Sequence, residues 1–208
     1  ESFRNDTRYR LAQVRETRLS DPAAAVALYR EMLTVQVDET RAIDALELLV
    51  QNDDAAVQAI TVLLERYEAS DRSADVVRLL ERRVLFEEAE QRIETLQVIQ
   101  GLCAGELSDV DRGMSAAARI YQSQPTDVSR SEVERFASLS GKYDVLAESY
   151  RLVLEQLEGA DGVSVALRLG ELYLQHLEDL QAAESVYREV LGRDTLNVVA
   201  LDALERIY

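Results

Sequence analysis

The sequence predicts an all-α protein built from repeated antiparallel helical hairpins. Its composition favours helix, because Ala, Leu, Glu and Arg are abundant while 208 residues contain only two prolines and eight glycines. Apolar residues recur with the period of a helix along most of the chain. A stretch near the N-terminus is also repeated near the C-terminus, and internal repeats are the sequence mark of a stacked repeat fold.

The apolar periodicity divides the chain into about twelve helices. Asp21-Pro22 predicts a helix start, with the aspartate as N-cap, and Asp179 occupies the same place near the C-terminus. Gly141 and Gly162 predict helix breaks. The expected helices are 5–19, 21–35, 39–51, 54–69, 72–87, 90–105, 109–123, 128–139, 142–158, 162–177, 179–192 and 196–208.

The repeat relates residues 10–49, the first copy, to residues 168–207, the last copy, without a gap. Fifteen of forty positions are identical, and LYREML of the first copy meets VYREVL of the last. A weaker middle copy begins with ELSDVDRG at 106–113. The interval between the first and middle copies contains one additional apolar-periodic segment, 54–70, which we expect to be an extra helix interrupting the regular repeat.

These residues resemble the tetratricopeptide repeat (TPR) family, in the form of a divergent, bacterial-type array. In the last copy, Leu169, Gly170 and Tyr173 match the L-G-x-x-Y of the family's first helix. Ala183, Tyr187 and Val190 match the A-x-x-x-F-x-x-A motif of the family's second helix if one residue is inserted in the turn between the two helices. The first copy keeps Leu11, Ala12, Ala25 and Tyr29, and the middle copy keeps Ile99, Gln100, Cys103, Gly113 and Ala117. The family's tryptophan and proline are replaced by Ala166 and Thr195.

The resemblance implies a right-handed α-solenoid with a concave face. One amphipathic hairpin cannot bury its apolar surface alone, so neighbouring hairpins stack and share it. We expect residues 1–208 to form a single solenoid. Because the chain starts at Glu1 and stops at ALERIY, we also expect it to be a fragment of a longer repeat protein.

Charge limits the partners that can be expected. The net charge is −16 and no basic stripe is present, which argues against binding to nucleic acid or to an acidic membrane surface. No apolar run approaches the ~18 residues of a membrane-spanning helix. We therefore expect a cytoplasmic protein whose charged partner, if any, is basic.

The residues that could carry chemistry have simpler structural interpretations. Cys103 could be imagined as a nucleophile with His176 as its base, but the repeat register places Cys103 at a packing position and His176 at a polar one. The E-x-x-H of a helical di-metal site, a calcium loop and a glycine-rich phosphate loop are all lacking. Arg78, Arg82 and Arg83 form either a small basic patch or ion pairs with nearby glutamates. The sequence thus predicts no catalytic residue, no cofactor and no metal.

The resemblance also implies where a partner would bind, along the concave face lined by the first helix of each hairpin. A basic or amphipathic helical segment of a protein partner suits this mixed, acidic surface best. A purely structural spacer within a longer solenoid has equal weight, a helical metal enzyme or hydrolase is a third alternative, and the chain ends could associate end to end. The expected face carries Tyr9, Gln13, Glu16, Glu94, Gln97, Leu167, Glu171, Leu174 and Gln175.

Overall fold

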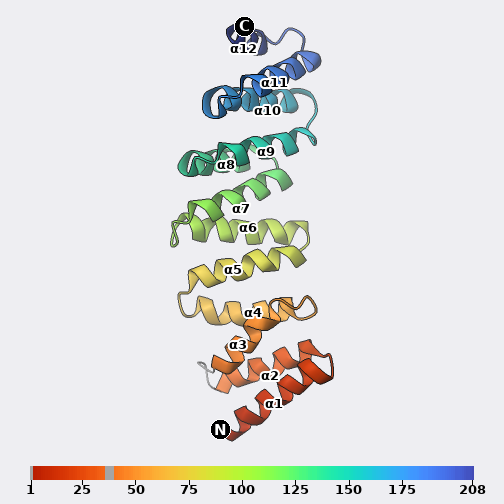
Figure 1. Cartoon of the computed structure of the whole chain (residues 1–208), viewed down its shortest axis with the longest axis vertical. Helices are drawn as coiled ribbons and strands as arrows, with labels where there is room; N and C mark the ends of the chain where they lie inside the picture. Colours follow the sequence, from red (N-terminus) through yellow and green to blue (C-terminus); the bar gives the residue numbers. More distant parts are fainter. Residues whose placement is uncertain (1, 36–39) are drawn as a thin grey trace. The chain divides into compact units, whose positions relative to one another are not determined.

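The computed structural model describes residues 2–35 and 40–208 (Figure 1). These residues form twelve α-helices and contain no strand, which confirms the predicted fold class. A 3₁₀ turn, Val84–Phe86, extends α5, and a π-helical turn, Tyr173–Leu177, extends α10. The helices are α1 Ser2–Arg18, α2 Pro22–Val35, α3 Thr40–Leu49, α4 Ala56–Glu68, α5 Ser73–Arg83, α6 Ala89–Ala104, α7 Val110–Ser123, α8 Asp127–Ser140, α9 Tyr143–Leu154, α10 Gly159–Leu172, α11 Leu180–Arg193 and α12 Val198–Ile207.

Most predicted boundaries agree with these helices to within a few residues, but one predicted break is wrong. Gly162 is buried inside α10, where an added Cβ would lie 2.9 Å from the carbonyl oxygen of Leu157. The chain instead turns at Gly159, whose φ of 62° is accessible mainly to glycine. The helix expected over 142–158 therefore ends early, at Leu154. Residue 39, expected to begin the third helix, lies outside the described residues.

The three sequence copies share one turn conformation, which supports the internal alignment. Ser20, Ser108 and Glu178 have φ values of 51°, 50° and 53°. In each copy the next residue is an aspartate whose carboxylate accepts a hydrogen bond from a backbone N–H of the following helix. These distances are 3.2 Å for Asp21, 3.1 Å for Asp109 and 2.9 Å for Asp179. The predicted N-caps are thus confirmed.

The described residues cluster into two compact units. The first comprises residues 1–95 and 105–107, and the second comprises residues 96–104 and 108–208, so α6 contributes to both. In the first unit, successive helices from α1 to α5 pack together. In the second, successive helices from α7 to α12 pack together, and α7 also packs on α9. The expectation of one continuous solenoid over residues 1–208 stays a prediction.

Close contacts between helices in the second unit depend on glycine. A Cβ added at Gly170 of α10 would lie 2.6 Å from the ring of Tyr187 in α11, and one added at Gly113 of α7 would lie 2.2 Å from the ring of Phe136 in α8. Both rings are almost fully buried. Each aromatic residue therefore fills the space that a missing side chain leaves on the preceding helix. Such consecutive pairs, each covered by its neighbours, make the chain a TPR-like array.

Candidate partner-binding groove

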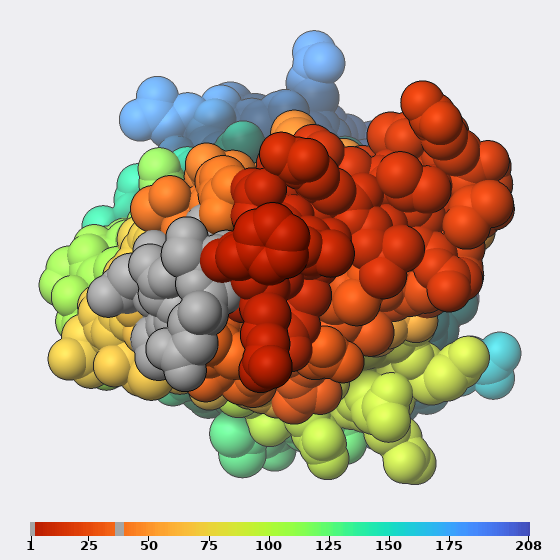
Figure 2. All heavy atoms as spheres, turned by 90° about the horizontal axis from the view of Figure 1, so that it is seen from below, coloured from red at the N-terminus to blue at the C-terminus, as the bar shows by residue number. Residues whose placement is uncertain are grey.

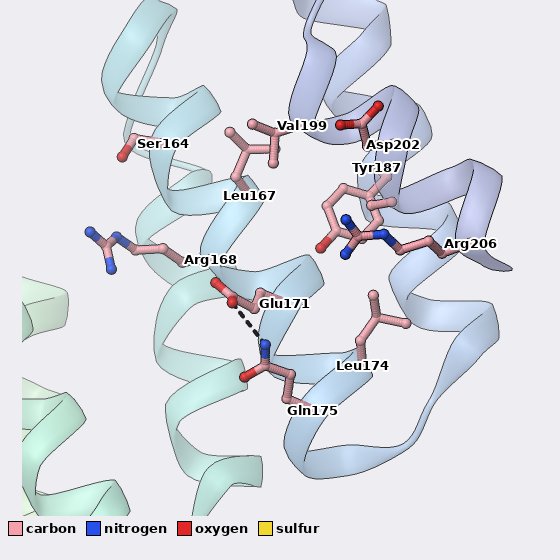
Figure 3. Close-up of a pocket in the computed structure, with 11 residues that line it drawn as sticks. Ser164, Leu167, Arg168, Glu171, Leu174, Gln175, Tyr187, Val199, Asp202 and Arg206 are labelled. Carbon is pink, nitrogen blue, oxygen red and sulfur yellow. Dashed lines mark hydrogen bonds between the residues drawn. The ribbon is translucent and has the colours of Figure 1, made fainter.

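A groove of about 460 Å³ lies on α10, its π-helical turn, α11 and α12, all within the second unit (Figure 3). Its apolar lining comes from α10 and the π-helical turn on one side and from α12 on the other. Charged side chains stand among these apolar groups. The lining residues are Ser164, Leu167, Arg168, Glu171, Leu174, Gln175, Tyr187, Val199, Asp202, Ala203 and Arg206.

Helical spacing explains why these residues share the groove. Leu167, Glu171 and Leu174 recur at intervals of four and three, which places them on one face of α10 and its extension. Val199 and Asp202 are three residues apart and therefore lie on one face of α12. That helix starts where the Asn197 side chain accepts a hydrogen bond of 3.1 Å from the backbone N–H of Ala200.

The π-helical turn ends the α10 wall of the groove. It closes with a hydrogen bond of 3.0 Å from the backbone N–H of Asp179 to the carbonyl oxygen of Tyr173. The first copy makes the same bond, also 3.0 Å long, from Asp21 to Arg15. The first and last copies therefore share a wide turn at this place, and in the last copy it carries Leu174 and Gln175 of the groove.

Electrostatics in the groove are mixed rather than uniformly acidic. The Gln175 amide donates a hydrogen bond of 2.8 Å to the Glu171 carboxylate. Burial, followed by the nearby Glu171 charge, raises the pKa of Tyr187 above its ordinary value, so its phenol stays protonated at neutral pH. Within the described chain, the exposed Asp202 carboxylate has no ion-pair partner and can accept a bond from a ligand.

A glutamate that faces a buried tyrosine recurs through the molecule. The Tyr29 hydroxyl donates to Glu16 at 3.4 Å, that of Tyr67 to Glu47 at 2.6 Å, and that of Tyr150 to Glu134 at 2.6 Å. In every pair the glutamate lies on a helix that precedes the tyrosine in the chain. These glutamates satisfy phenols at the edge of the core, so Glu16, expected to contact a partner, also has a structural role.

The structure brings together four of the nine expected binding residues. Leu167, Glu171, Leu174 and Gln175 all line the groove. On α1, the Tyr9 ring packs 5.8 Å from the Tyr29 ring, with the Arg41 guanidinium 5.2 Å from its centroid. Gln13 on α1 and both Glu94 and Gln97 on α6 are exposed. Whether all nine form a single face stays a prediction.

The groove also contains residues that the sequence did not suggest. Val199, Asp202 and Arg206 belong to α12, and Tyr187 belongs to α11. They were missed because only first helices of complete hairpins were considered. The repeat held a usable signal, since α12 follows the last hairpin as α3 follows the first, and Asp202 and Ala203 match Asp44 and Ala45 of α3.

The other residues singled out in the sequence have the predicted structural roles. Cys103 is fully buried, and His176 is exposed with its ring stacked 3.8 Å from the Tyr143 ring. Arg78 pairs with Glu47 at 2.6 Å, Arg82 with Asp53 at 2.5 Å and Arg83 with Glu87 at 2.8 Å. The three arginines of the expected basic patch therefore form ion pairs.

Residues 2–35 and 40–208 contain neither a metal-binding cluster nor a membrane-spanning helix. These residues hold no group of three or more His, Cys, Asp or Glu side chains placed to bind a metal ion. None of their helices combines the length and the apolar character needed to cross a lipid bilayer.

No protein-family model matches the chain, and no curated protein sequence matches it. Among solved structures it is similar to YrrB, a TPR protein with an unusual peptide-binding site, at 15% identity over 93% of this chain and 96% of that one, with a TM-score of 0.36. A candidate protein binding protein from Bacteroides ovatus ATCC 8483 is 13% identical over 98% and 95% of the two chains, with a TM-score of 0.43. TTC0263, a thermophilic TPR protein of Thermus thermophilus, is 18% identical over 98% and 96%, with a TM-score of 0.32. The assignment as a TPR-like array rests on the chain's own helix pairs and repeated turns.

Proposed function

We propose that the chain is a non-enzymatic protein-interaction module that holds a peptide or a partner helix in the groove of α10, α11 and α12. The observation that carries this proposal is the open groove itself, in which apolar side chains alternate with charged ones. Pockets that bind peptides combine these two features, because apolar contacts supply affinity and a few polar groups fix orientation. Four of the residues expected from the sequence line the groove, which adds support.

The lining favours a ligand of definite chemistry. Leu167, Leu174 and Val199 would cover one apolar side chain of the ligand, while Asp202 would accept a hydrogen bond from a lysine or arginine about one turn away. The net charge of −16 would draw such a basic or amphipathic segment toward the chain and raise its association rate. The cytoplasmic location stays a prediction.

Selection from a random peptide library tests this proposal. Peptides captured by the chain should contain an apolar residue close to a basic one. Their affinity should fall about tenfold or more with Val199→Arg and with Asp202→Lys, which remove the apolar contact and the acceptor. Both side chains are exposed, so neither change disturbs the core. Val128→Arg, at a position that is 75% exposed on α8, is the matched control and should leave affinity unchanged.

The same selection has two outcomes that would contradict the proposal. Capture of no peptide would favour the spacer interpretation, in which this segment only connects other parts of a solenoid. Peptides whose affinity survives both groove variants would place the binding surface elsewhere. Peptide-induced changes in amide chemical shifts would then show which helices form that surface.

A further inference from the structure

A second cavity, of about 330 Å³, adjoins the groove along α10. Arg168, Glu171 and Gln175 line both, and their spacing of three and four residues places them on one face of α10 and its π-helical turn. Figure 3 shows Arg168 pointing away from the α12 side of the groove. Glu134 and Ser138 line the second cavity from α8, so it lies entirely within the second unit.

The second cavity and the groove are consecutive copies of one site. A shift of 37 residues places Glu134 on Glu171, and it places YRLVL, residues 150–154, on YREVL, residues 187–191. Tyr150 lines the second cavity just as Tyr187 lines the groove. A ligand segment held in the groove therefore meets a related surface if it continues across α10.

The two glutamates of this repeated site differ in their charge partners. Glu134 accepts a hydrogen bond of 2.6 Å from the Tyr150 hydroxyl and pairs with Arg130 and Arg168, at 3.4 and 3.6 Å. Glu171 accepts a bond from the Gln175 amide and pairs with no cation within the described chain. The charge on the α8 side of the second cavity is thus already balanced, so a cationic side chain would gain little there.

The rest of the second cavity has an aromatic and aliphatic lining. The rings of Tyr143 and His176 are stacked, with their centroids 3.8 Å apart, and both residues line the cavity. Leu146 and Leu172 add aliphatic surface. An aromatic side chain suits this lining, because rings gain from ring partners beyond the area that they bury.

The first copy of the repeat has an aromatic side chain in a related place. Tyr29 is the equivalent of Tyr187, and the centroid of the Tyr9 ring lies 5.8 Å from that of Tyr29. Tyr9 belongs to α1, the red helix at the front of Figure 2. The repeat can therefore hold a ring against the tyrosine of this site.

We infer that the ligand proposed for the groove continues across α10 and places a neutral aromatic side chain in the second cavity. This inference rests on the proposed function, and it adds a third residue to the apolar and basic pair expected in the ligand. A helix with its side chains is ~10 Å across. The aromatic residue should therefore lie about three positions from the residue held in the groove if the ligand is extended, at ~3.3 Å per residue, or about seven if it is helical, at ~1.5 Å per residue.

Peptides selected on the chain test this inference through a double-mutant cycle. They should contain an aromatic residue at this spacing, and changing it to alanine should weaken binding about tenfold. Ser138→Arg places a long side chain over the second cavity from an exposed position and should cost as much, but the two changes together should cost no more than either alone. Val128→Arg adds the same charge to α8 outside both cavities and should leave affinity unchanged.

Nuclear magnetic resonance of the unchanged chain gives a second readout that depends on no variant. His176 is the single histidine, so its ring protons give a unique set of signals. A ligand ring in the second cavity should shift these signals, because an aromatic ring current acts on nearby protons. The peptide with alanine in place of the aromatic residue should leave them almost unmoved.

Two results would overturn the inference while the proposed function stands. The first is a peptide whose affinity falls with Asp202→Lys but not with Ser138→Arg, and which leaves the His176 signals unmoved. The second is an equal loss with Ser138→Arg for the aromatic and the alanine peptide, because the arginine would then not act on the ring. Capture of no peptide, or affinity that survives both Val199→Arg and Asp202→Lys, would instead overturn the proposed function and this inference with it.

Discussion

Tyr67 buries its ring against the first unit while its hydroxyl donates to Glu47, which also accepts a hydrogen bond from Arg78. Tyr150 repeats this arrangement with Glu134 in the second unit. Each phenol places a large apolar surface in the core and keeps its polar atom satisfied at the edge. The same residue type therefore contributes both packing and a fixed position for the neighbouring helix.

Alkaline pH should weaken the fold through these phenols. Burial, and then the hydrogen bond to Glu47, raises the pKa of Tyr67 to about 12, compared with about 10 in an unfolded chain. The folded state thus favours the neutral phenol, so its stabilising contribution is complete below pH ~10 and is lost as pH rises toward 12. Denaturant unfolding at a series of pH values should show the free energy of unfolding falling over this range.

The variant Tyr67→Phe isolates this contribution. It should be less stable than the unchanged chain at neutral pH by about 1 kcal/mol, because one hydrogen bond is lost. Above pH ~10 the difference should shrink, since the unchanged chain then loses the same contribution. A difference that stays constant between neutral pH and pH ~12 would show that the Tyr67 phenol does not titrate as described.

The burial or exposure of a single residue was predictable where the internal repeat contains an equivalent position for comparison. Cys103 aligns with the buried Tyr173, and His176 aligns with Arg18, so their burial and exposure followed from the register. The tyrosine–glutamate pairs were not predictable. Their separations in sequence are 13, 20 and 16 residues, because the paired residues lie at different distances from the turn between their two helices.

At the scale of elements, glycine sets the distance between α10 and α11. Gly170→Ala would place a methyl group 2.6 Å from the Tyr187 ring, so either the ring or the helix must move. Overpacking of this kind costs about 1–3 kcal/mol, and we expect a loss of that size in denaturant unfolding. Gly101 is the matched control, because its Cβ would have no neighbour within 4 Å. Gly101→Ala on α6 should instead stabilise the chain by up to ~1 kcal/mol.

Equal effects of the two alanine variants would contradict the glycine-dependent contact. Equal destabilisation would mean that α6 is as crowded at Gly101 as α10 is at Gly170. Equal stabilisation would mean that Tyr187 leaves room for a methyl group.

Helix positions followed from apolar periodicity, but several helix ends did not. The segment after Leu154 continues with residues that favour helix, which is why the sequence predicts a helix to residue 158. The structure ends this helix earlier because the chain turns at Gly159 and starts α10 there. Only the close approach of the Leu157 carbonyl and the Arg193 side chain to Gly162 distinguishes a glycine used for packing from one used for a turn.

At the scale of the whole molecule, the sequence predicted four of the eleven residues that line the groove. It indicated the α10 side, where residues recur on one helical face, but it did not indicate Val199 and Asp202 on α12. Which residues of two different helices face the same groove depends on how those helices pack, and periodicity within one helix carries no such information. The two compact units were not predicted for the same reason.

The central claim is that each helical pair shares buried surface only with its neighbours, and hydrogen exchange measured by mass spectrometry tests it directly. In Gly170→Ala, deuterium uptake should rise in α10 and in the adjoining α9, α11 and α12, while α1 and α2 should exchange as in the unchanged chain. Although α1 and α2 are the sequence counterparts of α10 and α11, they belong to the other compact unit. A uniform rise in uptake across both units would show a single shared core and would contradict the account.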